Sequence, residues 1–289
     1  MDLQLDGKKV LVTGSSKGIG AGIASKFALE GAIVIVHGRD RMQADEVAHA
    51  IAGQGGRAHV VLGDLTDDHA VENLLDDATR QAGTIDILIN NAGGSSAVKE
   101  DWTATRPATW AATYDRNVLA ALRVTSRLLP TMRQARWGRI INISSLAATM
   151  PPAGGPDYAA CKAAINAMTA SLAKAVAAEG ITVNAISPGT IHSATLDRKF
   201  RAAALEHGLE ADAPWAMIER TVLPLFAQVP VGRVGQVDDI ANAAAFLASP
   251  LAAYITGSNL RVDGGMSPGL GNKSAVTRRK DVTSMRYVL

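Results

Sequence analysis

Short runs of apolar residues alternate along the chain with longer stretches whose apolar positions recur at helical spacing. The apolar runs predict seven strands, at residues 8–13, 32–37, 58–63, 85–90, 138–144, 181–187 and 258–264. The intervening stretches predict helices near residues 18–31, 41–54, 67–82, 107–134, 157–179 and 237–249. Strands that are apolar throughout are typical of a parallel sheet covered by helices on both faces. The pattern therefore predicts an α/β fold with a doubly wound, seven-stranded parallel sheet.

A single series of seven strands favours one Rossmann-fold domain over two smaller domains, and we place that domain at residues 1–270. Residues 190–230 interrupt the alternation with charged helical pieces and no clear strand. This segment is expected to form a helical insertion or lid. Residues 271–289 are polar and basic, and we expect a tail that is mobile or used in subunit contacts.

Composition narrows the classes of function. The net charge of the 289-residue chain is only +2, so no basic excess points to nucleic acid. No apolar run approaches the roughly 18 residues of a spanning helix, and the N-terminus has no signal-peptide pattern. We therefore expect no membrane partner. The single cysteine, Cys161, allows no internal disulfide, so we expect a cytoplasmic protein. The six histidines lack metal-ligand spacing and are interpreted as surface or packing residues, so no metal is predicted.

The stretch VLVTGSSKGIGAGIA joins the first predicted strand to the first predicted helix and contains Gly14, Gly18 and Gly20. A strand, a glycine loop and a helix in this order direct backbone N–H groups and a helix N-terminus at a phosphate. The alternative is an ordinary tight turn. The position after the first of several parallel strands favours a nucleotide site.

From Thr13 to Gly20 the chain resembles the short-chain dehydrogenase/reductase family, whose mark is Thr-Gly-x-x-x-Gly-x-Gly. Further motifs of that family follow in order. NNAG at 90–93 follows the fourth strand, and SPGTIHS at 187–193 matches the segment that embraces the nicotinamide. The resemblance covers roughly residues 5–267 and is closest in pattern to 3-oxoacyl-(acyl-carrier-protein) reductases.

Tyr158 and Lys162 are four residues apart and share one face of a predicted helix. A nearby ammonium favours phenolate, so we expect Lys162 to lower the phenol pKa from about 10 and make Tyr158 a usable general acid or base. The resemblance adds Ser145, which would hydrogen-bond the substrate oxygen, and Asn117, which would hold a water linking Lys162 to solvent. Lys162 would also hold the nicotinamide ribose. Ser144 remains the alternative catalytic serine, and each residue alone would more often be a packing or surface residue.

The end of the second strand, IVIVHGRD, bears on the choice of cofactor. An acidic residue there would bind the ribose 2′-OH of NAD, whereas an arginine accommodates the 2′-phosphate of NADP. Gly38 and Arg39 occupy this point, and Lys17 is expected to direct a second cation to the same region. NADP(H) is therefore predicted rather than NAD(H), the alternative being that Arg39 is solvated and paired with Asp40. The predicted cofactor-binding residues are Gly14, Ser16, Lys17, Gly18, Ile19, Gly20, Arg39, Asp64, Leu65, Asn91, Ala92, Gly93, Tyr158, Lys162, Pro188, Gly189, Ile191 and Ser193.

The resemblance implies an oxidoreductase that interconverts a ketone or aldehyde and an alcohol, with a hydride from nicotinamide and a proton from Tyr158. The substrate could be a 3-oxoacyl thioester, or a sugar, polyol or xenobiotic carbonyl compound. Two other classes stay open, namely an NADP-binding regulator without turnover and an enzyme of dehydration or epimerisation. The candidate pocket walls are His192, Phe200, Trp215, Met217, Leu223 and Phe226.

Partners follow from the same resemblance. An acyl-carrier partner would need a basic surface beside the cleft, for which Arg133, Arg136 and Arg139 are candidates. The resemblance also implies a homotetramer, or a dimer, in which helices near 107–134 and 157–179 pair between subunits.

Overall fold

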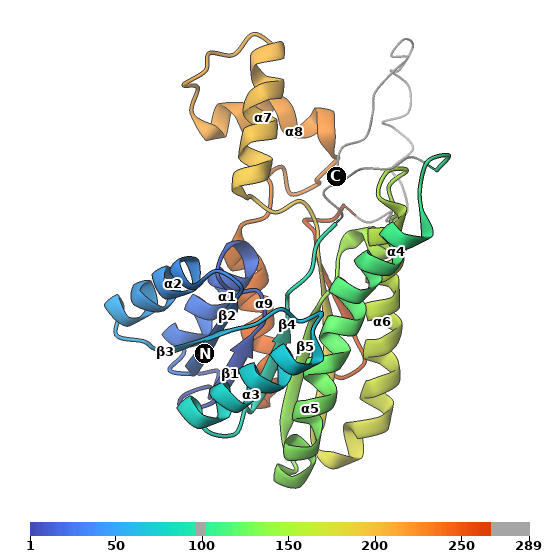
Figure 1. Ribbon diagram of the computed structural model, residues 1–289. Helices are drawn as coiled ribbons and strands as arrows, with labels where there is room; N and C mark the ends of the chain where they lie inside the picture. The colour runs from blue at the N-terminus through green and yellow to red at the C-terminus, as the bar shows by residue number, and fades with distance from the viewer. Residues whose placement is uncertain (96–101, 267–289) are drawn as a thin grey trace.

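The computed structural model describes residues 1–95 and 102–266 (Figure 1). Its seven strands are all parallel and lie in the order β3–β2–β1–β4–β5–β6–β7. They are β1 (Lys9–Val12), β2 (Ile33–Gly38), β3 (Arg57–Leu62), β4 (Ile87–Asn90), β5 (Gly138–Ile143), β6 (Ile181–Pro188) and β7 (Asn259–Val262). Each predicted strand is present with small shifts at its ends. The predicted doubly wound parallel sheet is confirmed.

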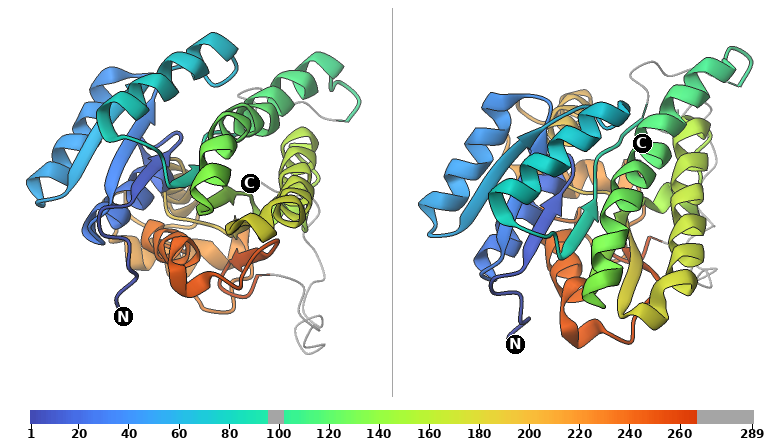
Figure 2. Two further views of the ribbon diagram at one scale, coloured as in Figure 1. Left: turned by 90° about the horizontal axis from the view of Figure 1, so that it is seen from below. Right: turned by 60° about the horizontal axis from the view of Figure 1, so that its bottom comes forward.

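Helices cover both faces of the sheet, as Figure 2 shows from two directions. Neighbouring residues of β1 belong to two different cores, Val10 to one and Leu11 to the other, because successive side chains of a strand point to opposite faces. The core with Val10 is closed by α1 (Gly18–Leu29), α2 (Arg41–Gly53) and α9 (Val237–Ala248). The core with Leu11 is closed by α3 (Asp68–Ala82), α5 (Ala120–Ala135) and α6 (Pro156–Val176).

The helix predicted near 107–134 is interrupted. Helix α4 (Pro107–Tyr114) continues through a π-helical turn, Asp115–Leu119, into α5. Such turns insert a residue into the helical repeat and are frequent at functional sites. Asn117 lies within this turn.

Helices α7 (Ala194–Glu206) and α8 (Trp215–Phe226) occupy the segment predicted as a helical insertion, and they stand apart from the sheet at the top of Figure 1. They pack mainly on each other. The Phe200 ring lies 5.6 Å from that of Trp215 and 5.1 Å from that of Phe226, and Leu223 is buried in the same cluster. Phe200 and Leu223, which were candidate pocket walls, lie in the core of this helical pair, and the half-buried Phe226 packs against it, so the alternative of simple packing holds for these three residues. The predicted tail, 271–289, lies outside the described residues.

The three arginines proposed for an acyl-carrier surface lie where α5 ends and β5 begins, at the amino end of the strands. Arg133 pairs with Glu179 at 2.7 Å, and Arg136 donates to the Ala178 carbonyl at 3.0 Å. Arg139 is buried. The expectation that these residues flank the chain's own cleft is wrong, because that cleft opens at the opposite end of the sheet.

Candidate active site

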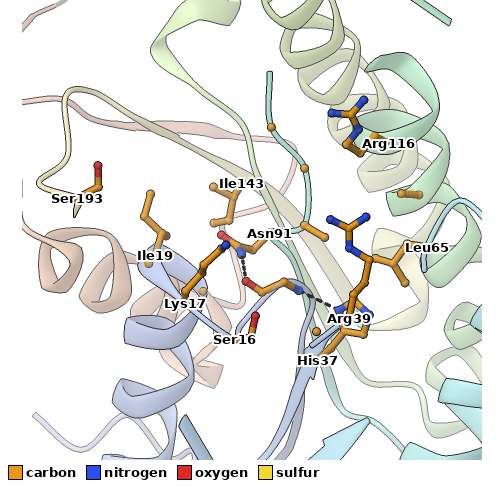
Figure 3. Close-up of a pocket in the computed structure, with 18 of the residues that line it drawn as sticks. Ser16, Lys17, Ile19, His37, Arg39, Leu65, Asn91, Arg116, Ile143 and Ser193 are labelled. Carbon is orange, nitrogen blue, oxygen red and sulfur yellow. Dashed lines mark hydrogen bonds between the residues drawn. The ribbon is translucent and has the colours of Figure 1, made fainter. Parts of the chain in front are cut away.

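A cleft of about 710 Å³ opens at the carboxyl ends of the strands. It includes the point between β1 and β4 where the strand order reverses, which is where open α/β sheets bind ligands. Every residue predicted to bind the cofactor lines this cleft, from Gly14 in the first loop to Ser193 beside α7 (Figure 3). The fold brings these residues together, and their individual contacts with a cofactor stay predictions. Among the six candidate pocket walls, all within the described ranges, only His192 lines the cleft.

The glycine loop is held in place by the end of β4. The Asn91 amide donates to the carbonyls of Thr13 at 2.9 Å and Gly14 at 3.0 Å, and the backbone N–H of Ala92 donates to the Thr13 hydroxyl at 3.0 Å. In the described part of the chain no side chain caps the start of α1, whose N-cap is Lys17. The first N–H groups of α1 are therefore available to an anion in the cleft.

His37 is a cleft residue that the sequence interpretation missed. Its ring is buried at the end of β2, where Nδ1 accepts from the Gly14 N–H at 3.0 Å and Nε2 lies 3.1 Å from the Gly63 carbonyl oxygen. Burial lowers the pKa of His37 below its usual value, and the nearby Arg39 adds to this effect. A polar residue near the carboxyl end of an otherwise apolar strand was the available signal.

Arg39 lies at the far end of the cleft from the catalytic candidates. Its Nη1 is 3.4 Å from Oδ2 of Asp64, and both side chains are largely exposed. Asp40 instead caps α2, accepting from the Met42 N–H at 3.0 Å. The alternative that Arg39 pairs with Asp40 is therefore wrong. The Asp64 carboxylate also accepts from the Thr66 N–H and hydroxyl, and these bonds hold its pKa below the usual value.

Besides Arg39 and Lys162, the basic side chains of Lys17 and Arg116 line the cleft. Figure 3 shows Lys17 on the side of Ile19 and Arg39 beside Leu65. Both side chains line the same cleft, and the prediction that Lys17 directs a second cation to the region of Arg39 stays a prediction. Arg116, which comes from the π-helical turn, lines the cleft and was not predicted.

The catalytic candidates meet where β5 ends and α6 begins. Nζ of Lys162 lies 5.5 Å from the centre of the Tyr158 ring and donates to the Ile143 carbonyl at 2.9 Å. The Ser145 hydroxyl lies near the Tyr158 phenol and acts to lower its pKa. The Ser144 hydroxyl donates to the Lys162 carbonyl at 3.1 Å and is buried, so its role here is to fix the helix backbone. This arrangement favours Ser145 over Ser144 as the catalytic serine.

Burial controls the protonation of this group. It raises the pKa of the Tyr158 phenol above 10.0, although the nearby Ser145 hydroxyl opposes the rise. It also lowers the pKa of Lys162 to about 8 and raises that of Cys161 to about 11. The net shift of the phenol pKa is therefore opposite to the predicted one, because the rise caused by burial outweighs the effects that lower this pKa. Tyr158 is therefore protonated at neutral pH and able to donate a proton.

Asn117 lies behind the cleft. Its amide donates to the carbonyls of Gly94 and Thr113, each at 2.9 Å, and its oxygen accepts from the Gly94 N–H at 3.0 Å. At Gly93, where φ is +151°, an added Cβ would lie 2.4 Å from that oxygen. These contacts fix the backbone after β4, and the role of Asn117 in holding a water that links Lys162 to solvent stays a prediction.

Metal-binding clusters and membrane-spanning helices are both absent from the described residues. Residues 1–95 and 102–266 contain no group of three or more His, Cys, Asp or Glu side chains that could hold a metal ion. None of the helices in these ranges is long and apolar enough to cross a membrane.

Comparisons with known proteins agree with this geometry. The family model described as enoyl-(acyl carrier protein) reductase matches residues 14–267. The 3-oxoacyl-(acyl-carrier-protein) reductase FabG of Vibrio cholerae is 37% identical over 269 residues, which cover 91% of this chain and 99% of that protein. The FabG of Escherichia coli is 36% identical over 266 residues, with the same coverage of 91% and 99%.

A solved structure is similar as well. The L-sorbose reductase of Gluconobacter frateurii, crystallised with NADPH and L-sorbose, matches with a TM-score of 0.84 and 32% sequence identity. The match covers 93% of this chain and 100% of that one. The family match, the relatives and the shared fold lead to one conclusion: the chain belongs to the short-chain dehydrogenase/reductase family of oxidoreductases.

Proposed function

We propose that this protein reduces a ketone or aldehyde to an alcohol with NADPH, and that Tyr158 supplies the proton. The observation that carries the proposal is the grouping of Ser145, Tyr158 and Lys162 in the cleft that also contains the glycine loop. A non-catalytic regulator would have no need of a protonated phenol placed with a serine and a lysine in this cleft.

The cleft suits a pyridine dinucleotide. Its volume of about 710 Å³ falls in the range of ligand sites, about 300–1,000 Å³. The uncapped start of α1 suits the pyrophosphate, and the exposed guanidinium of Arg39 suits a 2′-phosphate. The L-sorbose reductase of similar fold was crystallised with NADPH, which supports the same choice.

NADPH supplies a hydride to the carbonyl carbon when it is bound. Tyr158 then donates its proton to the carbonyl oxygen, which completes the alcohol. Ser145 hydrogen-bonds the same oxygen and stabilises the charge that develops there. The ammonium of Lys162, held by the Ile143 carbonyl, stabilises the phenolate until a proton from solvent restores the phenol.

Two substrate classes have support. The FabG relatives favour a 3-oxoacyl thioester, and the L-sorbose reductase favours a ketose sugar. Comparing kcat/KM for a 3-oxoacyl thioester and for L-sorbose under identical conditions decides between the two classes.

We also propose a cytoplasmic homotetramer or dimer. Two exposed apolar groups support an oligomer. Tyr114 and Leu122 lie on the helices expected to pair, and Phe246, Tyr254 and Leu260 lie around the last strand. The chain has a single cysteine, Cys161, which can form no internal disulfide, and this suits a reducing compartment.

Isotope transfer tests the reaction class. Two samples of NADPH are prepared, each with deuterium at one of the two hydrogen positions of nicotinamide C4. Each is incubated with enzyme and substrate, and the mass of the product is measured by mass spectrometry. One of the two cofactors should give an alcohol one mass unit heavier. A product of dehydration or epimerisation, without deuterium and without loss of NADPH, would overturn the proposal.

Cofactor choice is tested by Arg39→Ala. A charge-assisted hydrogen bond is worth about 1.5–3 kcal/mol, so the Kd for NADPH should rise at least about tenfold. The Kd for NADH, which lacks the 2′-phosphate, should change less than about twofold, because the lost bond belongs to that phosphate. Fluorescence titration measures both constants. Arg41→Ala is the matched control, since Arg41 pairs with Asp45 and does not line the cleft. Equal losses for both cofactors in Arg39→Ala would count against the phosphate contact.

A further inference from the structure

The buried imidazole of His37 connects two loops at the floor of the cleft. Nδ1 accepts from the backbone N–H of Gly14 in the glycine loop, at 3.0 Å. Nε2 lies 3.1 Å from the carbonyl oxygen of Gly63, after β3. The backbone of His37 is tied to the same glycine loop, because Ser15 N–H donates to its carbonyl at 2.8 Å and the Ser15 hydroxyl accepts from its N–H at 2.9 Å.

These partners specify one state of the ring. The Gly14 N–H can only donate, so Nδ1 must carry no hydrogen. The Gly63 carbonyl can only accept, so Nε2 must carry one. The ring is therefore neutral, in the Nε2–H tautomer. A second proton on Nδ1 would set two donors against each other at 3.0 Å, and the loop at Gly14 would have to move.

The charged groups around the ring are Asp64 and Arg39. Asp64 favours the protonated ring, whereas Arg39 disfavours it, and the larger effect is burial, which lowers the pKa of His37. Lys17 is the basic residue of the glycine loop itself, and it lines the same cleft. Protonation is therefore resisted at neutral pH and becomes significant only in acid.

We propose that His37 is a positioning residue for the cofactor, and that its neutral ring holds the glycine loop in the shape that binds the pyrophosphate of NADP(H). This proposal rests on the proposed function, because it assumes a dinucleotide in the cleft. Protonating the ring releases Gly14 and weakens cofactor binding. The affinity for NADP(H) is therefore highest above the pKa of His37 and decreases as the pH falls through that pKa.

The test compares NADP⁺ binding by wild-type protein and by His37→Asn from pH 8 down through the pKa of His37, which NMR titration of the imidazole gives. Asn can offer its oxygen to the Gly14 N–H close to the position of Nδ1, but it does not titrate. Below the pKa of His37, the Kd of the wild type should rise by up to about tenfold per pH unit relative to that of the variant. The 2′-phosphate of NADP⁺ also titrates, but this changes the Kd of both proteins equally and cancels when the two Kd values are compared. His49→Asn, an exposed histidine on α2, is the matched control and should behave as wild type.

A measurement on the wild-type protein alone makes the test independent of the variant's folding. By thermodynamic linkage, a ligand that binds more tightly to the protein with a neutral His37 than to the protein with a protonated His37 lowers the pKa of His37. NMR titration of the His37 imidazole should therefore give a lower pKa with NADP⁺ bound than without it. An unchanged or raised pKa, or the same pH dependence of Kd in wild type and His37→Asn, would overturn the role of His37 alone. No binding of NADP⁺ at any pH would overturn the proposed function together with it.

Discussion

Tyr158→Phe lowers kcat for carbonyl reduction by about 10³-fold or more, while NADPH binds with a Kd within about threefold of wild type. The substitution removes one oxygen and keeps the half-buried ring, so the packing around α6 is retained. The reaction loses the proton that must reach the substrate oxygen as the hydride arrives. Stopped-flow or steady-state oxidation of NADPH measures the first effect, and fluorescence titration measures the second.

The matched control is Tyr114→Phe, which removes a phenol oxygen from an exposed side chain on α4 and should leave kcat within about twofold. Retention of a tenth or more of wild-type kcat in Tyr158→Phe would show that another group protonates the substrate. Parallel loss of NADPH binding would instead show that the substitution disturbs the cleft as a whole.

Gly20→Ala weakens NADPH binding at least about tenfold, which corresponds to about 1.4 kcal/mol. Gly20 lies in the first turn of α1, where a Cβ would come within 2.4 Å of the Gly14 carbonyl oxygen and 2.5 Å of Nδ2 of Asn91. Both neighbours belong to the network that holds the glycine loop, so the loop must move to admit the methyl group. Overpacking of this kind also costs about 1–3 kcal/mol of the free energy of unfolding.

Gly53→Ala provides the control for Gly20→Ala. Gly53 is the last residue of α2, and a Cβ there would have no atom of the described chain within 4 Å. This variant should bind NADPH as wild type does and should be slightly more stable, since alanine favours helices over glycine. Calorimetry and NADPH titration on both variants separate a local effect on the loop from a general loss of stability. Wild-type affinity in Gly20→Ala would contradict the packing described for this loop.

The central strands were predictable because both faces of the sheet are covered there, which makes β1, β2 and β4 apolar along most of their length. The break in the helix around Asn117 was not predictable in the same way. A π-helical turn adds one residue without changing composition, and the residues on either side still follow a helical pattern. The aromatic residues of α7 and α8 show a second limit, since an amphipathic helix does not reveal which surface its apolar face covers.

The spacing of motifs was enough to nominate Ser145, Tyr158 and Lys162, which the fold does bring together in one cleft. Contacts between residues at the ends of neighbouring strands could not be predicted from the spacing of motifs. Arg39 meets Asp64, and His37 meets Gly14, only because β2 lies between β1 and β3 in the sheet. Similarly, the pKa of Tyr158 depends on how deeply the phenol is buried, and spacing along a helix does not determine burial.

The central claim is tested most directly by following oxidation of NADPH and NADH with the purified protein over a panel of 3-oxoacyl thioesters, sugars, diketones and quinones. We expect at least one carbonyl compound to be reduced with NADPH, with one alcohol formed for each NADPH consumed, and with a much lower kcat/KM when NADH is the donor. Conversion of a panel member without oxidation of either cofactor would contradict the account, and so would tight NADPH binding without turnover of any compound.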